Sequence, residues 1–207
     1  MSNLAITISR EYASGGRDIA TKLAQDLGIG YYDKEIIQMV SDKSGLAADF
    51  IEKSDEKISN AFIHNLQYTA YSGFDTVAYY DTPVPDKVYI AQSAVIRELA
   101  LKSDCIIVGR CADHILHNEP GLLRVFIRAE MSDRVKRAVE LYDLPNQKVE
   151  DSIKKIDKSR ANYYKFYTSL RWGDIEHYDL VINTSYSGID GAVDVIKALV
   201  KSKGYIK

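Results

Sequence analysis

The stretch Ser9-Arg-Glu-Tyr-Ala-Ser-Gly-Gly-Arg-Asp18 lies between a short run of β-forming residues and a helical pattern. The β-forming run covers residues 4–8, and the helical pattern comes from apolar residues at Ile19, Ala20, Leu23, Ala24 and Leu27. A loop with adjacent glycines between a strand and a helix can turn several backbone N–H groups toward one anion, with help from the helix dipole. The stretch therefore predicts a phosphate-binding loop, although paired glycines also serve ordinary tight turns.

Strand-like runs alternate with helical patterns along the rest of the chain. Residues 105–108 read Cys-Ile-Ile-Val before Gly109, which is typical of a buried parallel strand. We expect further strands at residues 31–33 (or a loop there), 122–127 and 178–183, and helices at residues 34–41, 92–102, 132–141, 148–164 and 191–201. Ser132 is the expected N-cap of its helix. The alternation predicts an α/β fold with a doubly wound parallel sheet, whose ligands bind outside the carboxyl ends of the strands.

The 207 residues predict one domain, with its core at residues 1–44 and 87–207. Residues 45–86 are irregular, with an amphipathic part, a tyrosine-rich part and a proline breaker, and we interpret them as an inserted helical lobe. The basic stretch at about residues 142–176 is the expected lid.

The overall composition limits the classes of partner and compartment. A net charge of −2 argues against binding of nucleic acid or of an anionic membrane. Two cysteines are too few for a disulfide framework, and no apolar run approaches the length of a membrane-spanning helix. These features predict a soluble, cytoplasmic protein that takes a small-molecule partner, and a homo-oligomer is left open.

Five short motifs occur in order along the chain, and together they carry a family resemblance. They are Ile8-Ser-Arg-Glu-Tyr12, Tyr32-Asp-Lys-Glu35, Val108-Gly-Arg-Cys-Ala-Asp113, Arg160-Ala-Asn-Tyr-Tyr164 and Trp172-Gly-Asp174. With these motifs the chain resembles the cytidylate kinase-like family, within the P-loop nucleoside monophosphate kinase group. The resemblance covers nearly the whole chain, and it implies the P-loop kinase fold and the use of ATP and Mg²⁺.

The glycine loop departs from the P-loop motif Gly-x-x-x-x-Gly-Lys-Ser/Thr. In register, Arg10 takes the first glycine position, and Gly16 stands where the lysine should contact the β and γ phosphates. Arg17 can supply the missing charge, and Asp18 can hold Mg²⁺ directly or through water. The alternatives are a solvated Arg17 and an Asp18 that only favours the helix dipole. The residues expected to bind the donor ATP are Ala13, Ser14, Gly15, Gly16, Arg17 and Asp18.

Residues that follow the later strands are candidates for the acceptor. Arg110 comes directly after a buried strand and Gly109, so a role on the acceptor phosphate is reasonable, and the resemblance implies the same role. Asp33 in the second motif and Asp113 are further acceptor candidates. A surface salt bridge for Arg110 and a local N-cap for Asp113 are the structural alternatives.

A basic segment follows in the second half of the chain. Residues 124–171 contain 12 Lys and Arg against 7 Asp and Glu, which suits a lid that brings cations onto a transferring phosphoryl group. The resemblance implies that Asp157 meets the nucleoside and Arg160 a phosphate. Arg134 and Arg137 are supporting ATP ligands, and Lys154 joins Arg17 and Arg160 as a catalytic candidate. A solvated helix face is the alternative.

These observations lead to one functional expectation and two rivals. The expectation is a nucleoside monophosphate kinase that transfers the γ-phosphoryl group of Mg·ATP to CMP, dCMP or a related nucleotide. The first rival is a nucleotide-binding sensor or interaction module without transfer, because the loop lacks its lysine. The second is a kinase for another small acceptor, because residues 45–86 show no motif that matches the substrate lobe of cytidylate kinases.

Overall fold

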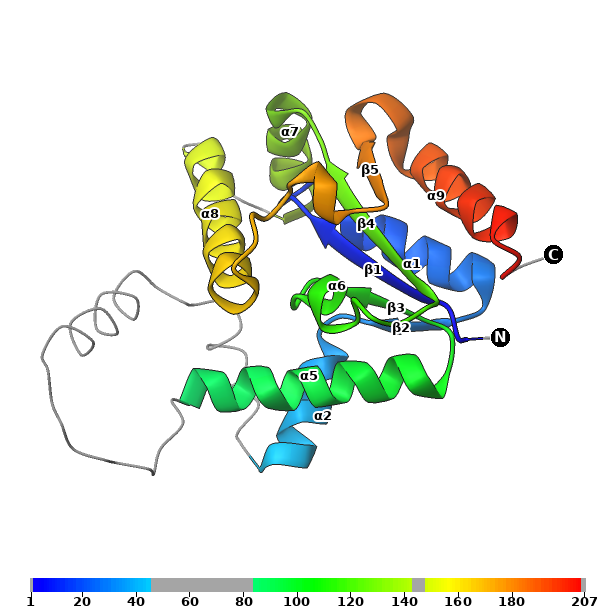
Figure 1. Cartoon of the computed structure of the whole chain (residues 1–207). Helices are drawn as coiled ribbons and strands as arrows, with labels where there is room; N and C mark the ends of the chain where they lie inside the picture. Colours follow the sequence, from blue (N-terminus) through cyan, green and yellow to red (C-terminus); the bar gives the residue numbers. More distant parts are fainter. Residues whose placement is uncertain (1, 46–83, 143–147, 206–207) are drawn as a thin grey trace, which may run out of the picture.

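The computed structural model describes residues 2–45, 84–142 and 148–205 (Figure 1). Its centre is a five-stranded sheet in the order β2-β3-β1-β4-β5, and every adjacent pair of strands is parallel. The strands are β1 (Ala5–Arg10), β2 (Gly30–Tyr32), β3 (Cys105–Val108), β4 (Leu122–Arg128) and β5 (Leu180–Asn183). The predicted α/β class with a parallel sheet is confirmed.

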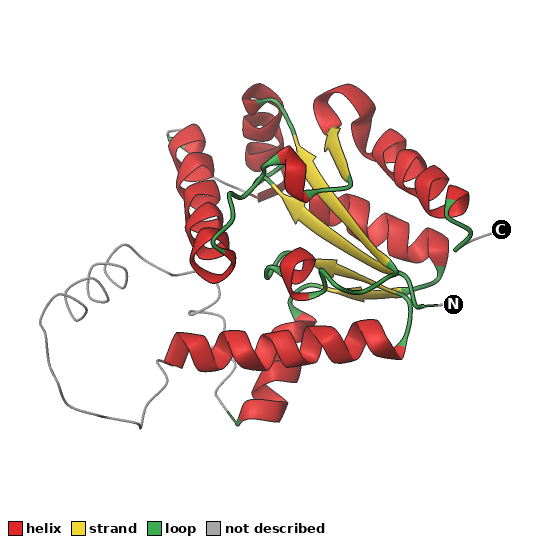
Figure 2. Ribbon diagram, in the orientation of Figure 1, coloured by secondary structure: helices red, strands yellow, loops and turns green. Residues whose placement is uncertain are grey.

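Helices cover both faces of the sheet (Figures 1 and 2). Helices α1 (Gly16–Leu27) and α9 (Thr184–Ser202) pack on one face, and α2 (Glu35–Ser44), α5 (Val84–Lys102) and the short α6 (Ala112–Ile115) pack on the other. Helices α7 (Met131–Tyr142) and α8 (Val149–Thr168) lie beyond the carboxyl ends of the strands, where Ala138, Val149 and Ile153 pack around Ala13. A 3₁₀ turn, Ile175–His177, precedes β5.

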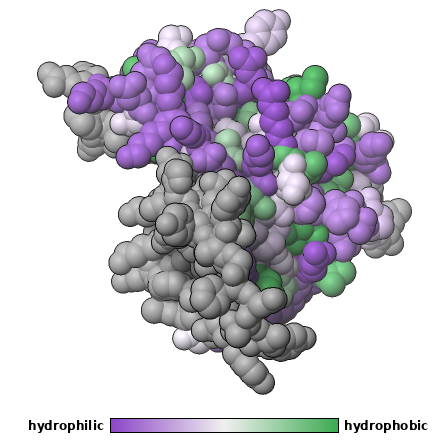
Figure 3. Space-filling model, turned by 60° about the vertical axis from the view of Figure 1, so that its left-hand side comes forward, coloured by the Kyte–Doolittle hydropathy of each residue, from purple (hydrophilic) through white to green (hydrophobic). Residues whose placement is uncertain are grey.

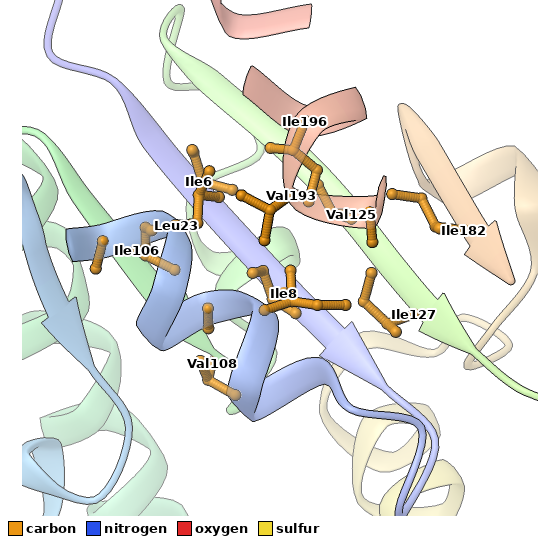
Figure 4. Close-up of a cluster of buried hydrophobic side chains, with 14 of the residues drawn as sticks. Ile6, Ile8, Leu23, Ile106, Val108, Val125, Ile127, Ile182, Val193 and Ile196 are labelled. Atoms are coloured by element: carbon orange, nitrogen blue, oxygen red, sulfur yellow. The ribbon is translucent and has the colours of Figure 1, made fainter. Parts of the chain in front are cut away.

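Side-chain alternation along the strands builds the two cores. Ile6 and Ile8 of β1 point toward α1 and α9, where they meet Leu23 and Val193 (Figure 4). Ala5, which precedes Ile6 and alternates to the other face, belongs to the opposite cluster with residues of α2 and α5. β1 is buried on both faces, as expected for a central parallel strand, and its small polar residues Thr7 and Ser9 are buried with its apolar ones.

The strand order locates the crevice where ligands bind in such sheets. The chain moves from β1 to β2, returns through β3 beside β1, and then crosses to β4 on the other side of β1. The order therefore reverses around β1, and the crevice opens at the carboxyl ends of β1 and β3. Arg10 ends β1, and Gly109 follows β3.

Three expectations about helix boundaries need correction. Helix α5 begins at Val84 instead of residue 92, so Pro85 of the expected proline breaker lies in its first turn. Ser132 is not an N-cap, because the carbonyl of Glu130 accepts from the N–H of Arg134 at 3.1 Å and α7 begins at Met131. The last helix begins at Thr184 instead of residue 191, with Asn183 as its cap and a break at Gly188. Residues 184–190 carry no apolar periodicity, so pattern reasoning missed them. Most of the expected lobe, residues 46–83, and residues 143–147 of the expected lid lie outside the described residues.

Candidate functional site

A cavity of about 470 Å³ opens at the carboxyl ends of β1 and β3. Its walls come from the loop after β1, the start of α1, the turn after β3 and one face of α8. The face of the molecule on the side of α8 is mainly hydrophilic outside the residues drawn in grey (Figure 3). The predicted site residues that line this cavity are Ala13, Gly15, Gly16, Arg17, Asp33, Arg110 and Arg160.

The loop after β1 ends in an anion-binding geometry. Ala13 and Gly15 have φ angles of 60° and 86°, and Gly15 is the N-cap of α1. A Cβ atom on Gly15 would lie 2.3 Å from the Cδ1 atom of Ile189, so any other residue at position 15 would displace that side chain. The first-turn N–H groups of α1, a helix of 12 residues, therefore start at the cavity wall. This arrangement fits a phosphate group.

Ser14 holds the loop and does not line the cavity. Its Oγ donates to the carbonyl of Glu11 at 2.9 Å and to that of Ile127 at 3.2 Å. The hydroxyl of Thr184, at the start of α9, donates to the carbonyl of Ser14 at 2.7 Å. A contact within the loop and contacts with β4 and α9 thus hold the loop at Ser14.

Arg134 and Asp157 also hold this loop, from α7 and α8. The Nε atom of Arg134 donates to the carbonyl of Tyr12 at 2.8 Å, and Asp157 accepts from the N–H of Tyr12 at 2.7 Å. The two side chains form an ion pair with each other, and Arg134 also pairs with Glu11 at 3.3 Å. Arg134 is only 4% exposed, and neither residue lines the cavity. The structure places both against the loop backbone.

Arg17 and Asp33 form an ion pair on the cavity wall. The Nη2 and Nε atoms of Arg17 lie 2.7 and 2.8 Å from Oδ2 of Asp33. The backbone N–H of Asp33 donates to Glu35 at 3.0 Å, and its carbonyl accepts from Nε of Arg110 at 3.2 Å. The sequence placed Arg17 with the donor and Asp33 with the acceptor, and the structure brings the two together.

The turn after β3 is strained. Gly109, Arg110 and Cys111 have φ angles of 74°, 57° and 55°, so three consecutive residues are left-handed. Non-glycine residues adopt this conformation only when the surrounding structure imposes it, and such strain concentrates at functional sites. The turn places Arg110 at the wall of the cavity.

Arg160 reaches the same cavity from α8. Its Nη1 atom donates to the carbonyl of Arg10 at 3.0 Å, and its guanidinium lies 5.6 Å from the ring centroid of Tyr12. Lys154, on the same helix, is 60% exposed, forms an ion pair with Glu150 and lies outside the cavity lining. Of these two predicted lid cations, Arg160 lines the cavity and Lys154 does not.

Asp113 lies behind the cavity wall. It is 3% exposed and accepts a hydrogen bond of 2.7 Å from the hydroxyl of Tyr164, a residue that lines the cavity. Burial raises the pKa of Asp113 above its usual value of 3.8. Asp113 is therefore linked to the cavity by its hydrogen bond with Tyr164.

Asp18 and Arg137 pair with each other away from this cavity. Nη1 of Arg137 lies 3.1 Å from Oδ2 of Asp18. Arg137 lines a second cavity of about 310 Å³, which Ala13 shares from the other side of the loop and which Thr184 also borders. Ala13 of the loop therefore borders both cavities.

The residues fit a polyphosphate better than a resident metal ion. Among the described residues, no group of three or more His, Cys, Asp or Glu side chains could hold a metal. Mg²⁺ commonly binds through phosphate oxygens, water and one or two carboxylates, so a metal that arrives with a nucleotide needs few protein ligands. Asp18, which faces Arg137, is the expected carboxylate.

Sequence reasoning assigned no role to Arg10, Glu11, Tyr12 or Thr184. Arg10 lines the cavity, Glu11 and Tyr12 receive the contacts of Arg134, and Thr184 fixes Ser14. For Arg10 a signal was present, because a P-loop that lacks its lysine needs a cation from elsewhere. No local sequence pattern predicts the contacts of Glu11, Tyr12 or Thr184.

Two curated relatives are cytidylate kinases. That of Thermococcus kodakarensis is 31% identical over 106 residues, which cover 50% of this chain and 52% of that protein. That of Methanopyrus kandleri is 26% identical over 112 residues, which cover 50% of this chain and 58% of that protein. Each match thus spans little more than half of the relative's length. No helix in the described part of the chain combines the length and apolar character needed to cross a membrane.

Solved structures and a family model complete the comparison. A crystal structure of an uncharacterized protein from Eubacterium ventriosum has a TM-score of 0.73 and 27% identity, covering 97% of this chain and 99% of that one. Shikimate kinase from Bacteroides thetaiotaomicron has a TM-score of 0.53 and 11% identity, covering 96% and 98%, and shares the P-loop kinase fold. The model described as the cytidylate kinase-like family matches residues 5–186, and the chain belongs to that family.

Proposed function

We propose that the protein is a nucleoside monophosphate kinase that transfers the γ-phosphoryl group of Mg·ATP to CMP or dCMP. The observation that carries the proposal is the convergence of the α1 N-terminus with Arg17, Arg110 and Arg160 on one cavity. Phosphoryl transfer depends mainly on positioning and on neutralising charge, and this cavity offers both.

Each wall of the cavity has a role in this proposal. The loop from Ala13 to Arg17 binds the donor phosphates through backbone N–H groups of α1. Arg110, aimed by the strained turn after β3, binds the acceptor phosphate, and Asp33 orients Arg17 beside it. Arg160 neutralises charge on the group in transit.

Residues outside the cavity act through the loop. Arg134 and Asp157 hold Tyr12 from both sides of its peptide, so they keep the loop in its phosphate-binding conformation. Arg137 is assigned to the second cavity, on the donor side of the loop. Mg²⁺ that enters with ATP would supply charge neutralisation at the phosphates. Asp18 is the carboxylate proposed for it, and it would have to exchange its ion pair with Arg137 outside the first cavity for the metal.

The preference for cytidine nucleotides rests on the family and on the names of the curated relatives. The test incubates purified protein with Mg·ATP and a panel of nucleoside monophosphates, and follows the phosphorylated product and ADP separately. Conversion of CMP or dCMP with at least a tenfold higher kcat/KM than AMP, GMP or UMP is the expected result. Equal conversion of all acceptors would contradict the preference and leave the kinase assignment intact.

Glycine at the lysine position favours one alternative, which is nucleotide binding without transfer. Calorimetric titration with ATP distinguishes it, because this alternative predicts binding with no product from any acceptor. A kinase for another small acceptor predicts ADP formation only when a non-nucleotide acceptor is present. Formation of CDP excludes both alternatives.

A further inference from the structure

The side chain of Arg10 occupies the space above Gly16. A Cβ atom built on Gly16 would lie 2.6 Å from Cβ and 2.9 Å from Cγ of Arg10. The Cβ atom of Arg10 is placed by the backbone, so no change of rotamer relieves the shorter of these two contacts. No side chain at position 16, including the lysine of the P-loop motif, is therefore compatible with Arg10 in its observed place.

From Gly16 the Arg10 side chain extends across the cavity to the turn after β3. Its Nη1 atom lies 2.3 Å from the position that a Cβ atom on Gly109 would take, and its Cζ atom lies 3.4 Å from the same position. Gly109 has no Cβ, so the guanidinium fits against its Cα. Arg10, Gly16 and Gly109 all line the cavity.

The guanidinium of Arg10 thus lies between the two halves of the candidate site. The donor half is the start of α1, at Gly15 and Gly16, and the acceptor half begins at Arg110, directly after Gly109. A phosphoryl group that passes from donor to acceptor must cross the gap that this side chain spans. Arg17, the cation predicted from the sequence, is instead bound to Asp33 on the cavity wall.

We propose that Arg10 is a catalytic residue that replaces the P-loop lysine, with Gly16 and Gly109 kept free of side chains to make room for it. The inference rests on the proposed kinase function and deepens it. In the transfer, the bond from the γ-phosphorus to the bridging oxygen of ADP breaks as a bond to an acceptor phosphate oxygen forms. Arg10 donates hydrogen bonds to the non-bridging oxygens and keeps its own protons.

The experiment replaces the cation at position 10 with a lysine at position 16, where the P-loop motif has it. Arg10→Gly removes the side chain and restores the first glycine of the P-loop motif, and Gly16→Lys in that background restores the lysine. We expect Arg10→Gly to lower kcat by about 10²–10³-fold and to weaken ATP binding about tenfold or more. The double variant R10G/G16K should regain at least tenfold in kcat over Arg10→Gly. Gly16→Lys alone should gain nothing, because Arg10 blocks the site.

A matched control and two readouts keep the test decisive. Arg97→Ala removes an exposed arginine from α5 and should leave kcat and ATP affinity unchanged. Circular dichroism and urea unfolding verify that every variant is folded. The proposal is overturned if folded Arg10→Gly keeps wild-type kcat and ATP affinity, or if R10G/G16K is no more active than Arg10→Gly.

Failure of the proposed function is recognised separately. If the wild-type protein binds Mg·ATP or tripolyphosphate in calorimetry but forms no product with any acceptor, the kinase assignment fails. The binding data still decide the place of Arg10, since Arg10→Gly should weaken tripolyphosphate binding and R10G/G16K should restore it. Wild-type protein that binds neither probe overturns both proposals.

Discussion

Asp157, in helix α8, accepts a hydrogen bond of 2.7 Å from the backbone N–H of Tyr12, 145 residues earlier in the chain. The carbonyl of Tyr12 is bound by Arg134, and Arg134 pairs with Asp157. An ion pair between the buried Arg134 and the partly buried Asp157 therefore holds one residue of the glycine loop through both its N–H and its carbonyl. A charge of this kind is costly to leave unpaired, so this ion pair couples the loop to α7 and α8.

Asp157→Ala is expected to destabilise the fold and to weaken ATP binding together. The substitution leaves the buried guanidinium of Arg134 with Glu11 as its remaining carboxylate partner, at 3.3 Å. Removing one partner of such a pair costs about 3 kcal/mol of unfolding free energy. Urea unfolding and calorimetric titration with ATP measure the two effects. Lys158→Ala, an exposed change on the same helix, should stay within about 0.5 kcal/mol of wild type. Wild-type stability in Asp157→Ala would show that this ion pair does not hold the loop.

Gly15→Ala and Gly28→Ala separate backbone strain from steric conflict at the two ends of α1. Both glycines have positive φ, 86° and 64°, so alanine costs about 1 to 2 kcal/mol at each. Only at Gly15 does the new Cβ meet another side chain, that of Ile189 at 2.3 Å. We expect Gly15→Ala to be the less stable variant and to lose ATP binding, whereas Gly28→Ala keeps wild-type affinity. Equal ATP affinities in the two variants would argue against a phosphate site at Gly15.

Arg160→Ala is expected to lower turnover and leave the fold intact. The change removes one hydrogen bond to the carbonyl of Arg10, worth about 1 kcal/mol, but removes a full charge from the cavity. We expect kcat to fall by about 10³-fold, measured by CDP formation at saturating substrates. Lys165→Ala, exposed on the same helix, is the control and should keep wild-type kcat. Normal turnover in Arg160→Ala would exclude it from catalysis.

Arg17→Ala is expected to act on the acceptor more than on the donor. Its guanidinium is bound to Asp33, whose carbonyl accepts from Arg110 on the acceptor side. We expect the KM for CMP to rise about tenfold and the KM for ATP to change less than about threefold. Initial rates with each substrate varied in turn give both constants. A larger effect on ATP would instead support Arg17 as the donor cation.

Asp113→Asn is expected to change how stability depends on pH. Burial raises the pKa of Asp113 above 3.8, so the stability that its protonated form confers is fully present below about pH 3.8. That stability is lost as the pH rises through the folded-state pKa. Asparagine carries no such penalty and can still accept from Tyr164.

The stability of Asp113→Asn relative to wild type should therefore grow as the pH rises above about 4, as measured by urea unfolding. Asp194→Asn, an exposed change on α9, is the control and should run parallel to wild type. A constant difference between Asp113→Asn and wild type across this range would show that Asp113 titrates as it does in the unfolded chain.

Local patterns predicted most of the fold. Apolar runs such as Cys105–Val108 and helical periodicity depend on neighbours along the chain, and they gave the strands and helices in the correct order. Where periodicity was absent, as in residues 184–190, the helix was missed. Ser132 was placed as a cap because its residue type favours that position, but the hydrogen bonds to Glu130 set the boundary.

The candidate site was predicted in part. The sequence alone determined that a glycine loop follows the first strand, that Arg110 follows another buried strand, and that basic residues gather in the second half of the chain. It also determined that the P-loop lysine is absent. These features depend only on which residues are present and in what order, and both are fixed before the chain folds.

Only the tertiary structure decided which of these residues meet. It set Arg10 above Gly16 and against Gly109, paired Arg17 with Asp33, and turned Arg134 and Asp157 onto the backbone of Tyr12. The physical reason is that each contact joins residues on different elements, and their distance depends on the strand order and on helix packing. The sequence determines the charge of each residue. The hydrogen-bond partner of that residue depends on which groups the packing of the elements brings within hydrogen-bonding distance.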